Sequence, residues 1–375
     1  MKNQLERLSR EINKRKEKNA FRTLNDHHHL IDFTSNDYFG IARSKEFSEF
    51  INNKISQFEL NGSGGSRLLS GNFSTTEKVE EFIANYHLAE AALIFNSGYD
   101  ANIGLFSAIL KKGDVVIYDE YIHASVRDGI RLGLAQSFSF KHNDISDLER
   151  LLKKQSGNVY VAIESVYSMD GDIAQLTKIS DLCKKYNAAL IVDEAHSAGI
   201  YGDSGNGMCV EDNIHHDCFA RIITYGKTFG VHGAAVIGCK VLRDYLINFS
   251  RSFIYTTALP LHSILSIKAA YEYLQLHHKE LKISLSANTQ LFKDLAIKNN
   301  LPLGNTFNTA IQTILIPGND KVRETAEFLQ KNGFDVRPIM SPTVPEGNER
   351  LRIIIHTFNT SEQIENLIKL LKSKL

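Results

Sequence analysis

An aspartate, a histidine and a lysine follow apolar stretches near the middle of the chain. Asp193 and His196 come after one stretch, and a second stretch ends in Thr224 shortly before Lys227. A carboxylate at the end of a strand can hold a ring N–H in its charged form. A lysine flanked by a hydroxyl and glycines suits a Schiff base beside a phosphate. These residue types therefore favour a site for a covalently bound cofactor.

Each of these residues also has an ordinary structural interpretation. Asp193 would cap the turn after its strand, and His196 would be a surface histidine with its hydrogen bonds satisfied. Lys227 would be a solvated surface charge, as most lysines are. The spacing of Lys227 from Asp193 and His196 favours a site over these alternatives.

The chain around these residues alternates between short apolar runs and helical patterns, as βα units require. This alternation predicts an α/β fold with a largely parallel sheet, covered by helices on both faces. Ligands of such sheets bind at the carboxyl ends of the strands. The expected strands are Ala91–Phe95, Val115–Tyr118, Val159–Ile163, Ala189–Val192, Arg221–Thr224 and Ala234–Ile237.

Two further regions flank this expected sheet. Residues 4–19 place Leu5, Leu8 and Ile12 at helical spacing in a charged segment, which predicts an amphipathic arm that packs on something larger. From about Tyr271 the pattern becomes that of a smaller α+β domain. After a long helix, its expected elements are strand Ala310–Ile316, helix Val322–Asn332, strands Asp335–Pro338 and Leu351–His356, and helix Ser361–Leu371.

The length of 375 residues allows two or three domains. We expect an N-terminal arm over residues 1–45, a large domain over 46–270 and a smaller α+β domain over 271–375. No internal repeat or low-complexity segment interrupts this division.

The composition gives no reason to expect several classes of partner. Basic and acidic residues number 43 each, so the overall charge does not favour a nucleic-acid or membrane partner. No apolar run approaches the roughly 20 residues that span a bilayer, and there is no GxGxxG or P-loop pattern. The four cysteines have no CxxC spacing and no secretory signal opens the chain, which predicts a cytoplasmic protein with reduced thiols.

The motif Asp193-Glu-Ala-His196 together with Thr224-Tyr-Gly-Lys227 resembles the α-oxoamine synthase family of fold-type I pyridoxal-phosphate enzymes. The resemblance implies an aspartate aminotransferase-like fold with a large, mostly parallel sheet domain and a smaller α+β domain. The chain departs from many relatives at Thr75-Thr76, where they carry a histidine. Further matching segments are Ser35-Asn-Asp-Tyr38, Gly62-Ser-Gly-Gly-Ser-Arg67, Ser70-Gly-Asn72, Ser97-Gly-Tyr99, His123-Ala-Ser125, Ser168-Met-Asp-Gly-Asp172, Pro342-Thr-Val-Pro345 and Arg350-Leu-Arg352.

The resemblance implies a role for each residue that contacts the cofactor. Lys227 would form the Schiff base with pyridoxal 5′-phosphate, Asp193 would pair with the ring nitrogen and His123 would stack on the ring face. For His123 alone, a structural histidine is the alternative. The remaining contacts would be Ser168 and His196 on the side of the ring hydroxyl, and Gly98, Tyr99 and Thr224 at the phosphate. Thr256, for which an ordinary turn hydroxyl is the alternative, would reach the phosphate from the other subunit of a homodimer.

Other matching positions concern the substrate. Arg352 resembles the family's carboxylate-binding arginine, because its planar fork suits a two-pronged grip, whereas Arg350 is expected in the solvated rim. Arg22, Asn36 and Thr343 match positions of substrate contacts, as does His123. A plain surface position is the alternative for Arg22, which follows a highly charged helix.

The resemblance implies a decarboxylative condensation of an amino acid with an acyl thioester. The segment from Tyr225 to Ala235 and the loop Thr343–Pro345 most resemble members that join L-alanine to a pimeloyl thioester in biotin biosynthesis. Whether the acyl group is carried on coenzyme A or on a carrier protein stays open. Two sister reactions are alternatives, glycine with acetyl-CoA and serine with a long-chain acyl-CoA. An aminotransferase, or a cofactor-binding protein that condenses nothing, is the alternative from another class.

Overall fold

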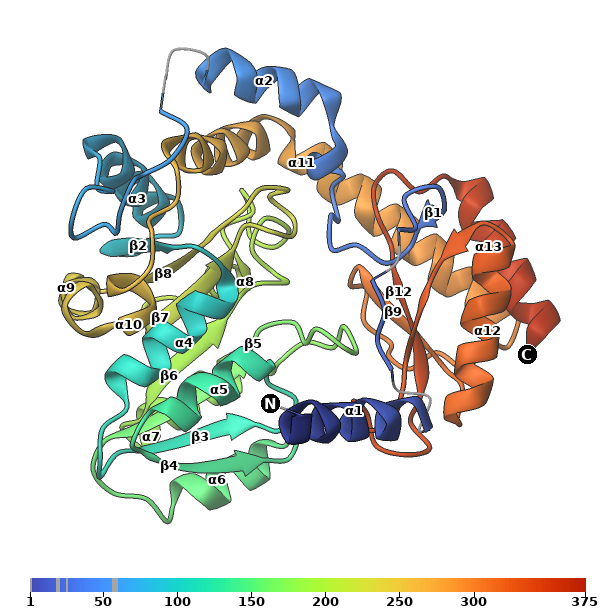
Figure 1. Cartoon of the computed structure of the whole chain (residues 1–375), viewed down its shortest axis with the longest axis horizontal. Helices are drawn as coiled ribbons and strands as arrows, with labels where there is room; N and C mark the ends of the chain where they lie inside the picture. The colour runs from blue at the N-terminus through green and yellow to red at the C-terminus, as the bar shows by residue number, and fades with distance from the viewer. Residues whose placement is uncertain (1, 18–20, 25, 56–59) are drawn as a thin grey trace.

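A seven-stranded sheet forms the core of the larger domain, on the left of Figure 1, and the smaller domain lies to its right. The computed structural model describes residues 2–17, 21–24, 26–55 and 60–375. The strand order is β2-β8-β7-β6-β5-β3-β4, and neighbours are parallel except where β8 pairs with β2 and β7. The predicted, largely parallel sheet is thereby confirmed. Its strands are β2 (Ala91–Phe95), β3 (Val115–Asp119), β4 (Gln136–Phe140), β5 (Val159–Glu164), β6 (Ala189–Asp193), β7 (Cys218–Thr224) and β8 (Ala234–Gly238).

The expected strands agree with these bounds to within a few residues, and β4 is the exception because no expected strand covers it. Its sequence, Gln-Ser-Phe-Ser-Phe, lies at the edge of the sheet and is mostly exposed. An edge strand with one exposed face needs no continuous apolar run. The central strands β5 and β6 are buried and rich in β-branched residues, which explains why their pattern is so clear.

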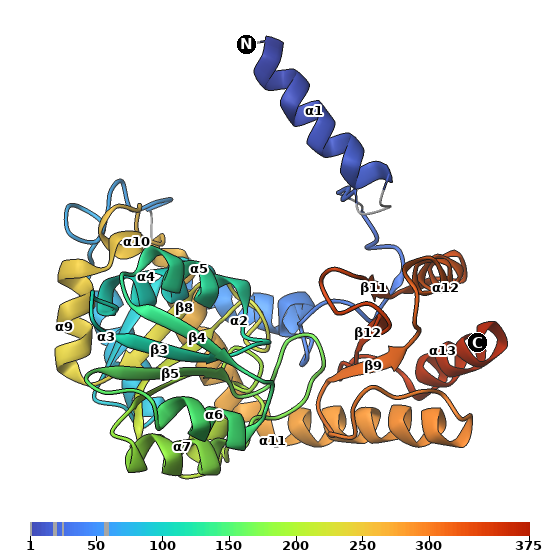
Figure 2. The ribbon, with the colours of Figure 1, turned by 90° about the horizontal axis from the view of Figure 1, so that it is seen from below.

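Helices cover both faces of the sheet (Figure 2). Successive side chains of a strand point to opposite faces, so Ala162 packs in the cluster that contains Leu105 of one helical layer. Its neighbour Val161 packs in the cluster that contains Leu148 and Ile179 of the other layer. The helices of these layers are α4 (Gly98–Ile109) and α5 (Ala124–Leu132) on one face, and α6 (Ile145–Leu152) and α7 (Leu176–Lys185) on the other.

The remaining helical segments of the large domain lie on both faces and at the ends of the sheet (Figure 1). They are η1 (Ile41–Arg43), α2 (Lys45–Ile55), α3 (Ser74–Tyr86), α8 (Met208–Glu211), α9 (Lys240–Phe249) and α10 (Arg251–Ile254). Val79 and Ile83 share a core cluster with Ala92 on one face, and Leu242 and Phe253 share the cluster of Leu93 on the other.

The smaller domain combines a three-stranded antiparallel sheet with two helices. The sheet has the order β11 (Arg337–Ile339), β12 (Arg350–Ile354) and β9 (Ile311–Leu315), and the helices are α12 (Asn319–Lys331) and α13 (Ser361–Lys374). The expected strand Asp335–Pro338 is divided between β10 (Phe334–Asp335) and β11. A segment from the N-terminal part of the chain, β1 (Ile31–Asp32), pairs in parallel with β10. The neighbouring Phe33 is buried in the core of this domain.

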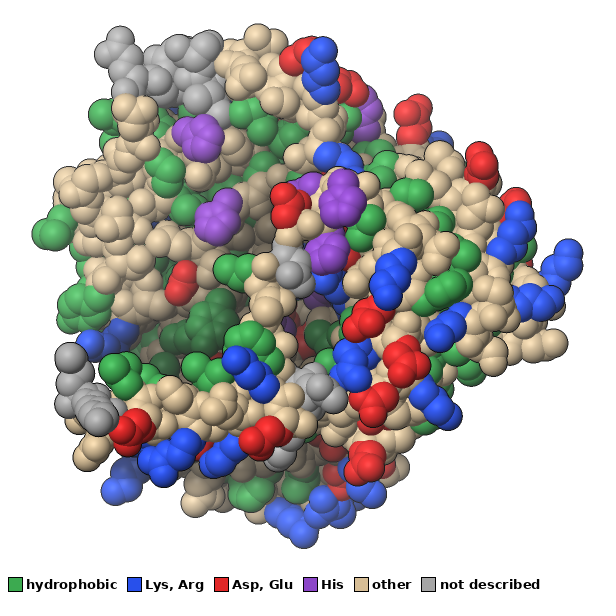
Figure 3. All heavy atoms as spheres, turned by 45° about the vertical axis from the view of Figure 1, so that its right-hand side comes forward, with side chains coloured by type: hydrophobic (Ala, Val, Ile, Leu, Met, Phe, Trp, Pro, Cys, Tyr) green, Lys and Arg blue, Asp and Glu red, His purple; other side chains and the backbone are tan. Residues whose placement is uncertain are grey.

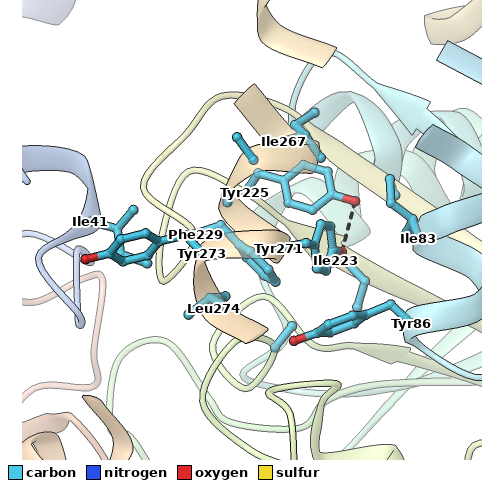
Figure 4. Packing of buried hydrophobic residues seen from close by; sticks show 14 of the residues in the cluster. Ile41, Ile83, Tyr86, Ile223, Tyr225, Phe229, Ile267, Tyr271, Tyr273 and Leu274 are labelled. Atoms are coloured by element: carbon cyan, nitrogen blue, oxygen red, sulfur yellow. Dashed lines mark hydrogen bonds between the residues drawn. The ribbon is translucent and has the colours of Figure 1, made fainter. Parts of the chain in front are cut away.

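One helix connects the two domains. It is α11 (Leu261–Lys298), which begins earlier than the helix expected from Tyr271 and therefore runs across the expected boundary at residue 270. With 38 residues at 1.5 Å per residue, it is about 57 Å long. Tyr271 anchors it in the large domain, where Figure 4 shows its ring among Tyr225, Phe229 and Tyr86.

The helix α1 (Lys2–Glu17) projects away from both domains in Figure 2. It agrees with the expected arm, whose residues 18 and 19 lie outside the described part of the chain. Leu5, Leu8 and Ile12 are 57%, 58% and 44% exposed, so its apolar side chains face solvent in the single chain. Among the helices described, none has both the length and the hydrophobicity that crossing a membrane requires.

Tyr271→Phe is expected to destabilise the protein by about 1–3 kcal/mol. The Tyr271 hydroxyl lies 2.7 Å from His87 Nε2 and 3.2 Å from the Tyr225 hydroxyl, so its removal leaves buried polar groups without a partner. The measurement is the free energy of unfolding in urea. Tyr273→Phe is the control, because the hydroxyl of Tyr273 bonds Glu46, whose side chain is 69% exposed. Equal losses in both variants would contradict this account.

Candidate active site

The carboxyl ends of adjacent strands bring the candidate residues together. Glu164 ends β5, Asp193 ends β6 and Thr224 ends β7, and Glu164 and Asp193 are paired across the sheet. Because these strands are parallel, their carboxyl ends meet at one edge, where ligands of such sheets bind. The first turn of α4, which follows β2, reaches the same edge at Gly98, where a Cβ would lie 2.6 Å from Thr224 Oγ1.

Asp193 is held in a fixed orientation at this edge. Its Oδ2 accepts a hydrogen bond of 2.8 Å from Asn102 Nδ2, and its Oδ1 accepts one of 3.0 Å from the Ala195 amide. Asn102 belongs to α4 and also donates to Ser125 Oγ at 3.0 Å. The buried carboxylate is therefore oriented by two elements before any ligand binds, and its free lone pairs can accept a ring N–H.

A hydrogen-bonded run leads from Lys227 to the N-terminal segment. Lys227 Nζ lies 2.8 Å from His196 Nε2, and His196 Nδ1 lies 2.6 Å from the Tyr38 hydroxyl. Tyr38 in turn donates to Asn36 Oδ1 at 3.3 Å. A neutral imidazole has one donor and one acceptor nitrogen, so it can bond the Lys227 amine and the Tyr38 hydroxyl at the same time. The histidine thus holds the lysine amine in place.

The run continues into the smaller domain through Arg352. Its Nη2 donates to Asn36 Oδ1 at 3.0 Å, and its Nε donates to the Ser168 carbonyl at 2.7 Å. A guanidinium has five N–H donors, so further donors remain for a ligand. The structure brings Asn36, Ser168 and Arg352 together, although they come from three distant parts of the sequence.

Burial and neighbouring charges shift several pKa values at this edge. Burial lowers the pKa of Lys227 to about 8, against the opposing effect of Asp193 and Glu164. Burial also raises the pKa of Glu164 to about 8, and the charge of Asp193 adds to this rise. Burial lowers the pKa of His196 well below its usual value, with Lys227 and Arg352 adding to the effect, so the imidazole is neutral. A lysine with such a pKa has a reactive neutral fraction near physiological pH.

The first turn of α4 provides an anion site next to Lys227. The first N–H groups of a helix have no acceptor within the helix, and Ser97 Oγ caps only that of Asp100, at 3.1 Å. The amides of Gly98 and Tyr99 are therefore available to a phosphate. Thr256 lies nearby, because its Oγ1 accepts a hydrogen bond of 3.1 Å from Asn96 Nδ2.

A cavity of about 290 Å³ lies beside the predicted cofactor residues. His123, the N-cap of α5, lines it together with Ser168 and Thr343. His123 Nδ1 lies 2.7 Å from Ser125 Oγ, and burial lowers the pKa of its imidazole. In the space-filling view of Figure 3, one face of the molecule has a deep recess with hydrophobic side chains on its floor.

His142 fastens the loops that form this cavity. Its Nδ1 lies 2.9 Å from Asp119 Oδ1 and its Nε2 lies 2.6 Å from Asp172 Oδ2. Burial lowers its pKa, but the hydrogen bonds to Asp119 and Asp172 outweigh this effect and raise the pKa to about 9. The protonated imidazole therefore ties the loop before His123 to the loop after Ser168.

Most of the site residues predicted from the sequence lie together at the carboxyl ends of the strands. The positions of two arginines, Arg22 and Arg350, differ from what their expected roles require. Arg22 is exposed, and none of the hydrogen bonds or ion pairs recorded among the described residues joins it to the site. Arg350 was expected in the solvated rim, and this expectation is wrong. The residue is only 7% exposed and forms an ion pair with Asp170. Alternation along β12 places Arg350 and Arg352 on the same side of the strand, so both point away from solvent.

Four residues at this edge received no role from the sequence, namely Tyr38, Asn102, Glu164 and His142. Tyr38 and Glu164 stand in or beside motifs that match a known family, which was the available signal. Asn102 and His142 act only through contacts with residues distant in sequence, and no local pattern marks such contacts.

Comparisons with known proteins agree with this geometry. The model of the family Aminotransferase class I and II matches residues 28–371. An 8-amino-7-oxononanoate synthase of Emericella nidulans is 39% identical over 90% of this chain and 88% of its own length. The solved 8-amino-7-oxononanoate synthase of Francisella tularensis is 29% identical, with a TM-score of 0.80 over 92% of this chain and 97% of that one. A serine palmitoyltransferase of Sphingomonas wittichii is 27% identical, with a TM-score of 0.87 over 92% of this chain and 87% of that one. A solved structure of SPT with its PLP internal aldimine has the same identity, TM-score and coverages.

His142→Gln is expected to destabilise the protein mainly at acidic and neutral pH. A group whose pKa is raised in the folded state contributes stability that is fully present below its unfolded pKa, about 6.5, and is lost as pH rises through about 9. The difference in unfolding free energy between wild type and variant should therefore shrink over this range in urea titrations. His232→Gln, at an exposed position, should change stability little. A His142→Gln difference that stays constant with pH would show that the imidazole is not charged.

Proposed function

The chain belongs to the aminotransferase class I and II family, and from this premise we propose that it condenses L-alanine with a pimeloyl thioester to 8-amino-7-oxononanoate. It is an enzyme, and its cofactor is pyridoxal 5′-phosphate. The product belongs to the biosynthesis of biotin. The observation that carries the proposal is the series of hydrogen bonds from Lys227 through His196, Tyr38 and Asn36 to Arg352, which connects the lysine proposed to bind the cofactor with the arginine proposed to bind the substrate carboxylate.

The residues at the strand ends fit this cofactor. Asp193 has free lone pairs for the ring nitrogen, and the Gly98 backbone lies so close to Thr224 that a side chain at position 98 would collide with the Thr224 hydroxyl, a proposed phosphate contact. His123 would cover the ring face, with Ser168 and His196 on the side of the ring hydroxyl. The phosphate would be held by the amides of Gly98 and Tyr99, by Thr224 and by Thr256 of a second subunit.

The chain's own side chains would perform the proton transfer and the positioning. The cofactor, when bound, supplies an acceptor for the electrons released at Cα. Lys227 removes the Cα proton, since its pKa of about 8 leaves a neutral fraction and His196 Nε2 orients its amine. Asp193 keeps the ring nitrogen protonated through its charge. Arg352 holds the substrate carboxylate with the donors that Asn36 and Ser168 leave free.

In the condensation, a bond forms between Cα and the thioester carbonyl, the thiol leaves, and the original carboxylate is released as carbon dioxide. Asn36, Thr343 and Arg22 are proposed as further substrate contacts. Because Arg22 is exposed in the single chain, its contact would require a second subunit. The carrier of the acyl group, coenzyme A or a carrier protein, would be bound outside the cavity.

We propose that the enzyme works as a homodimer in the cytoplasm. Tyr255, which precedes Thr256, is 72% exposed, and Leu68 and Leu69 of the neighbouring segment are 51% and 85% exposed; this apolar surface supports a partner there. The two segments lie together because Ala258 donates to the Gly65 carbonyl. The cysteines are all unpaired, which supports a reducing compartment.

The proposed function is tested by identifying products. The protein, loaded with its cofactor, is incubated with pimeloyl-CoA and with alanine, glycine or serine in turn, and the products are analysed by mass. We expect 8-amino-7-oxononanoate from alanine and no product from Lys227→Ala. Product only from glycine with acetyl-CoA, or only from serine with palmitoyl-CoA, would assign a sister reaction. Exchange of amino groups with a keto acid and no condensation would assign an aminotransferase.

Arg352→Ala is expected to weaken binding of L-alanine by roughly 30- to 5,000-fold while cofactor binding stays unchanged. Loss of one charge-assisted contact in a partly buried site costs about 2–5 kcal/mol. The dissociation constant is read from the change in cofactor absorbance during alanine titration. Arg337→Gln is the matched control, because Arg337 lies directly opposite Arg352 on β11 but pairs with Asp335. An unchanged alanine constant in Arg352→Ala would mean that another group holds the carboxylate.

A further inference from the structure

The cavity beside His123 contains an arginine that the proposed reaction does not yet use. Three segments line the cavity, namely residues 120–127, 168–170 and 343–345. Arg127 lies on the first of these, one helical turn after His123 on α5. Residues four apart in a helix share a face, with about 5–6 Å between their Cβ atoms. The guanidinium-bearing residue Arg127 is therefore one helical turn from His123, which is proposed to cover the cofactor ring.

The guanidinium of Arg127 is only partly paired. Its Nη2 donates to the Glu120 carbonyl, and its Nε is buried without a hydrogen-bond partner. Its carbon Cζ lies 5.9 Å from the centre of the Tyr118 ring, which limits its freedom. Among the ion pairs between described residues, none involves Arg127. A buried N–H without an acceptor costs free energy, and an anionic ligand would remove this cost.

The acidic residues that line the cavity are already engaged. Asp170 forms an ion pair with Arg350, and Glu120 Oε1 accepts a hydrogen bond of 2.9 Å from the His142 amide. His123 also lines the cavity, but burial lowers the pKa of its imidazole. Arg127 is therefore the permanent positive charge that the described lining residues offer to a ligand.

The rest of the lining is suited to methylene groups. Tyr121, Ile122, Met169, Val344 and Pro345 contribute apolar surface. The volume of about 290 Å³ is at the small end of ligand pockets, which span about 300–1,000 Å³. A largely apolar cavity of this size with a cation in its lining fits a short chain with a terminal anion better than a long hydrocarbon chain.

We propose that Arg127 binds the distal carboxylate of a dicarboxylic acyl group and thereby selects the acyl substrate by the charge at its far end. A guanidinium can bind a carboxylate through two parallel hydrogen bonds. This inference rests on the proposed function, because it assumes that an acyl thioester enters beside His123. The phosphates of coenzyme A are separated from the thioester by the whole pantetheine arm, so a cation one helical turn from His123 lies too near to be their contact.

The test compares two acyl thioesters that differ only at the far end, pimeloyl-CoA and heptanoyl-CoA, with the cofactor-loaded enzyme and L-alanine. For wild type, we expect kcat/KM to favour pimeloyl-CoA by at least about 30-fold. Arg127→Met should bring this ratio close to one, chiefly by raising KM for pimeloyl-CoA. Arg127→Lys should retain part of the preference, since it keeps the charge but lacks the fork.

Arg131→Met is the matched control, because Arg131 lies one turn further along α5 with its side chain 77% exposed and paired with Asp128. It should keep the wild-type ratio. A second measurement needs no turnover: calorimetry should show that pimelate binds wild type more tightly than its uncharged diamide, pimelamide, does, and that Arg127→Met removes the difference. If Arg127→Met fails to fold, the comparison of pimelate with pimelamide on wild type and Arg127→Lys takes its place.

The outcomes separate the two proposals. Turnover of pimeloyl-CoA with an unchanged ratio in Arg127→Met would overturn the role of Arg127 and leave the proposed function intact. An equal loss for both thioesters would also overturn it, because Arg127 would then contact the thioester carrier. If wild type condenses neither thioester, the proposed function fails, and binding of pimelate in preference to pimelamide, lost in Arg127→Met, would still support the carboxylate site.

Discussion

The contact between Lys227 Nζ and His196 Nε2 is the interaction on which the rest of the site depends. It requires a neutral histidine, and burial supplies this condition. It also requires that two strand ends lie side by side, which the parallel pairing of β6 and β7 provides. Through Tyr38 the same contact reaches the N-terminal segment and Arg352 of the smaller domain. One series of hydrogen bonds therefore positions the lysine amine, the N-terminal segment and Arg352 relative to one another.

Much of the large domain and the centre of the site could be predicted from the sequence. Buried parallel strands are continuous apolar runs, and Asp193, His196 and Lys227 follow directly from their ends. The edge strand β4 lacks that signal because its side chains are mostly exposed. The sequence predicts a long helix only from about Tyr271, whereas α11 begins at Leu261.

The parts of the site that could not be predicted depend on contacts between distant segments. Arg350 is a charged residue in a charged stretch of sequence, and only its pairing with Asp170 explains its burial. Glu164 reads as the polar end of a strand, yet its position beside Asp193 makes it part of the electrostatic environment of Lys227. Asn102 orients Asp193 from a different helix. Three-dimensional proximity decides these roles, and residue type alone does not.

The pairing of β1 with β10 has a consequence for the order in which the protein forms during translation. Ile31 and Asp32 pair with Phe334 and Asp335, and the Phe33 carbonyl accepts a hydrogen bond from the Ile354 amide. These early residues can therefore form their contacts only when the last part of the chain has left the ribosome. Contacts of such large sequence separation form slowly. The large sheet, whose strands lie between residues 91 and 238, can assemble before that moment as a unit. Lys227 can thus be in place on a finished sheet before Arg352, which contributes to its surroundings from the smaller domain, has been synthesised.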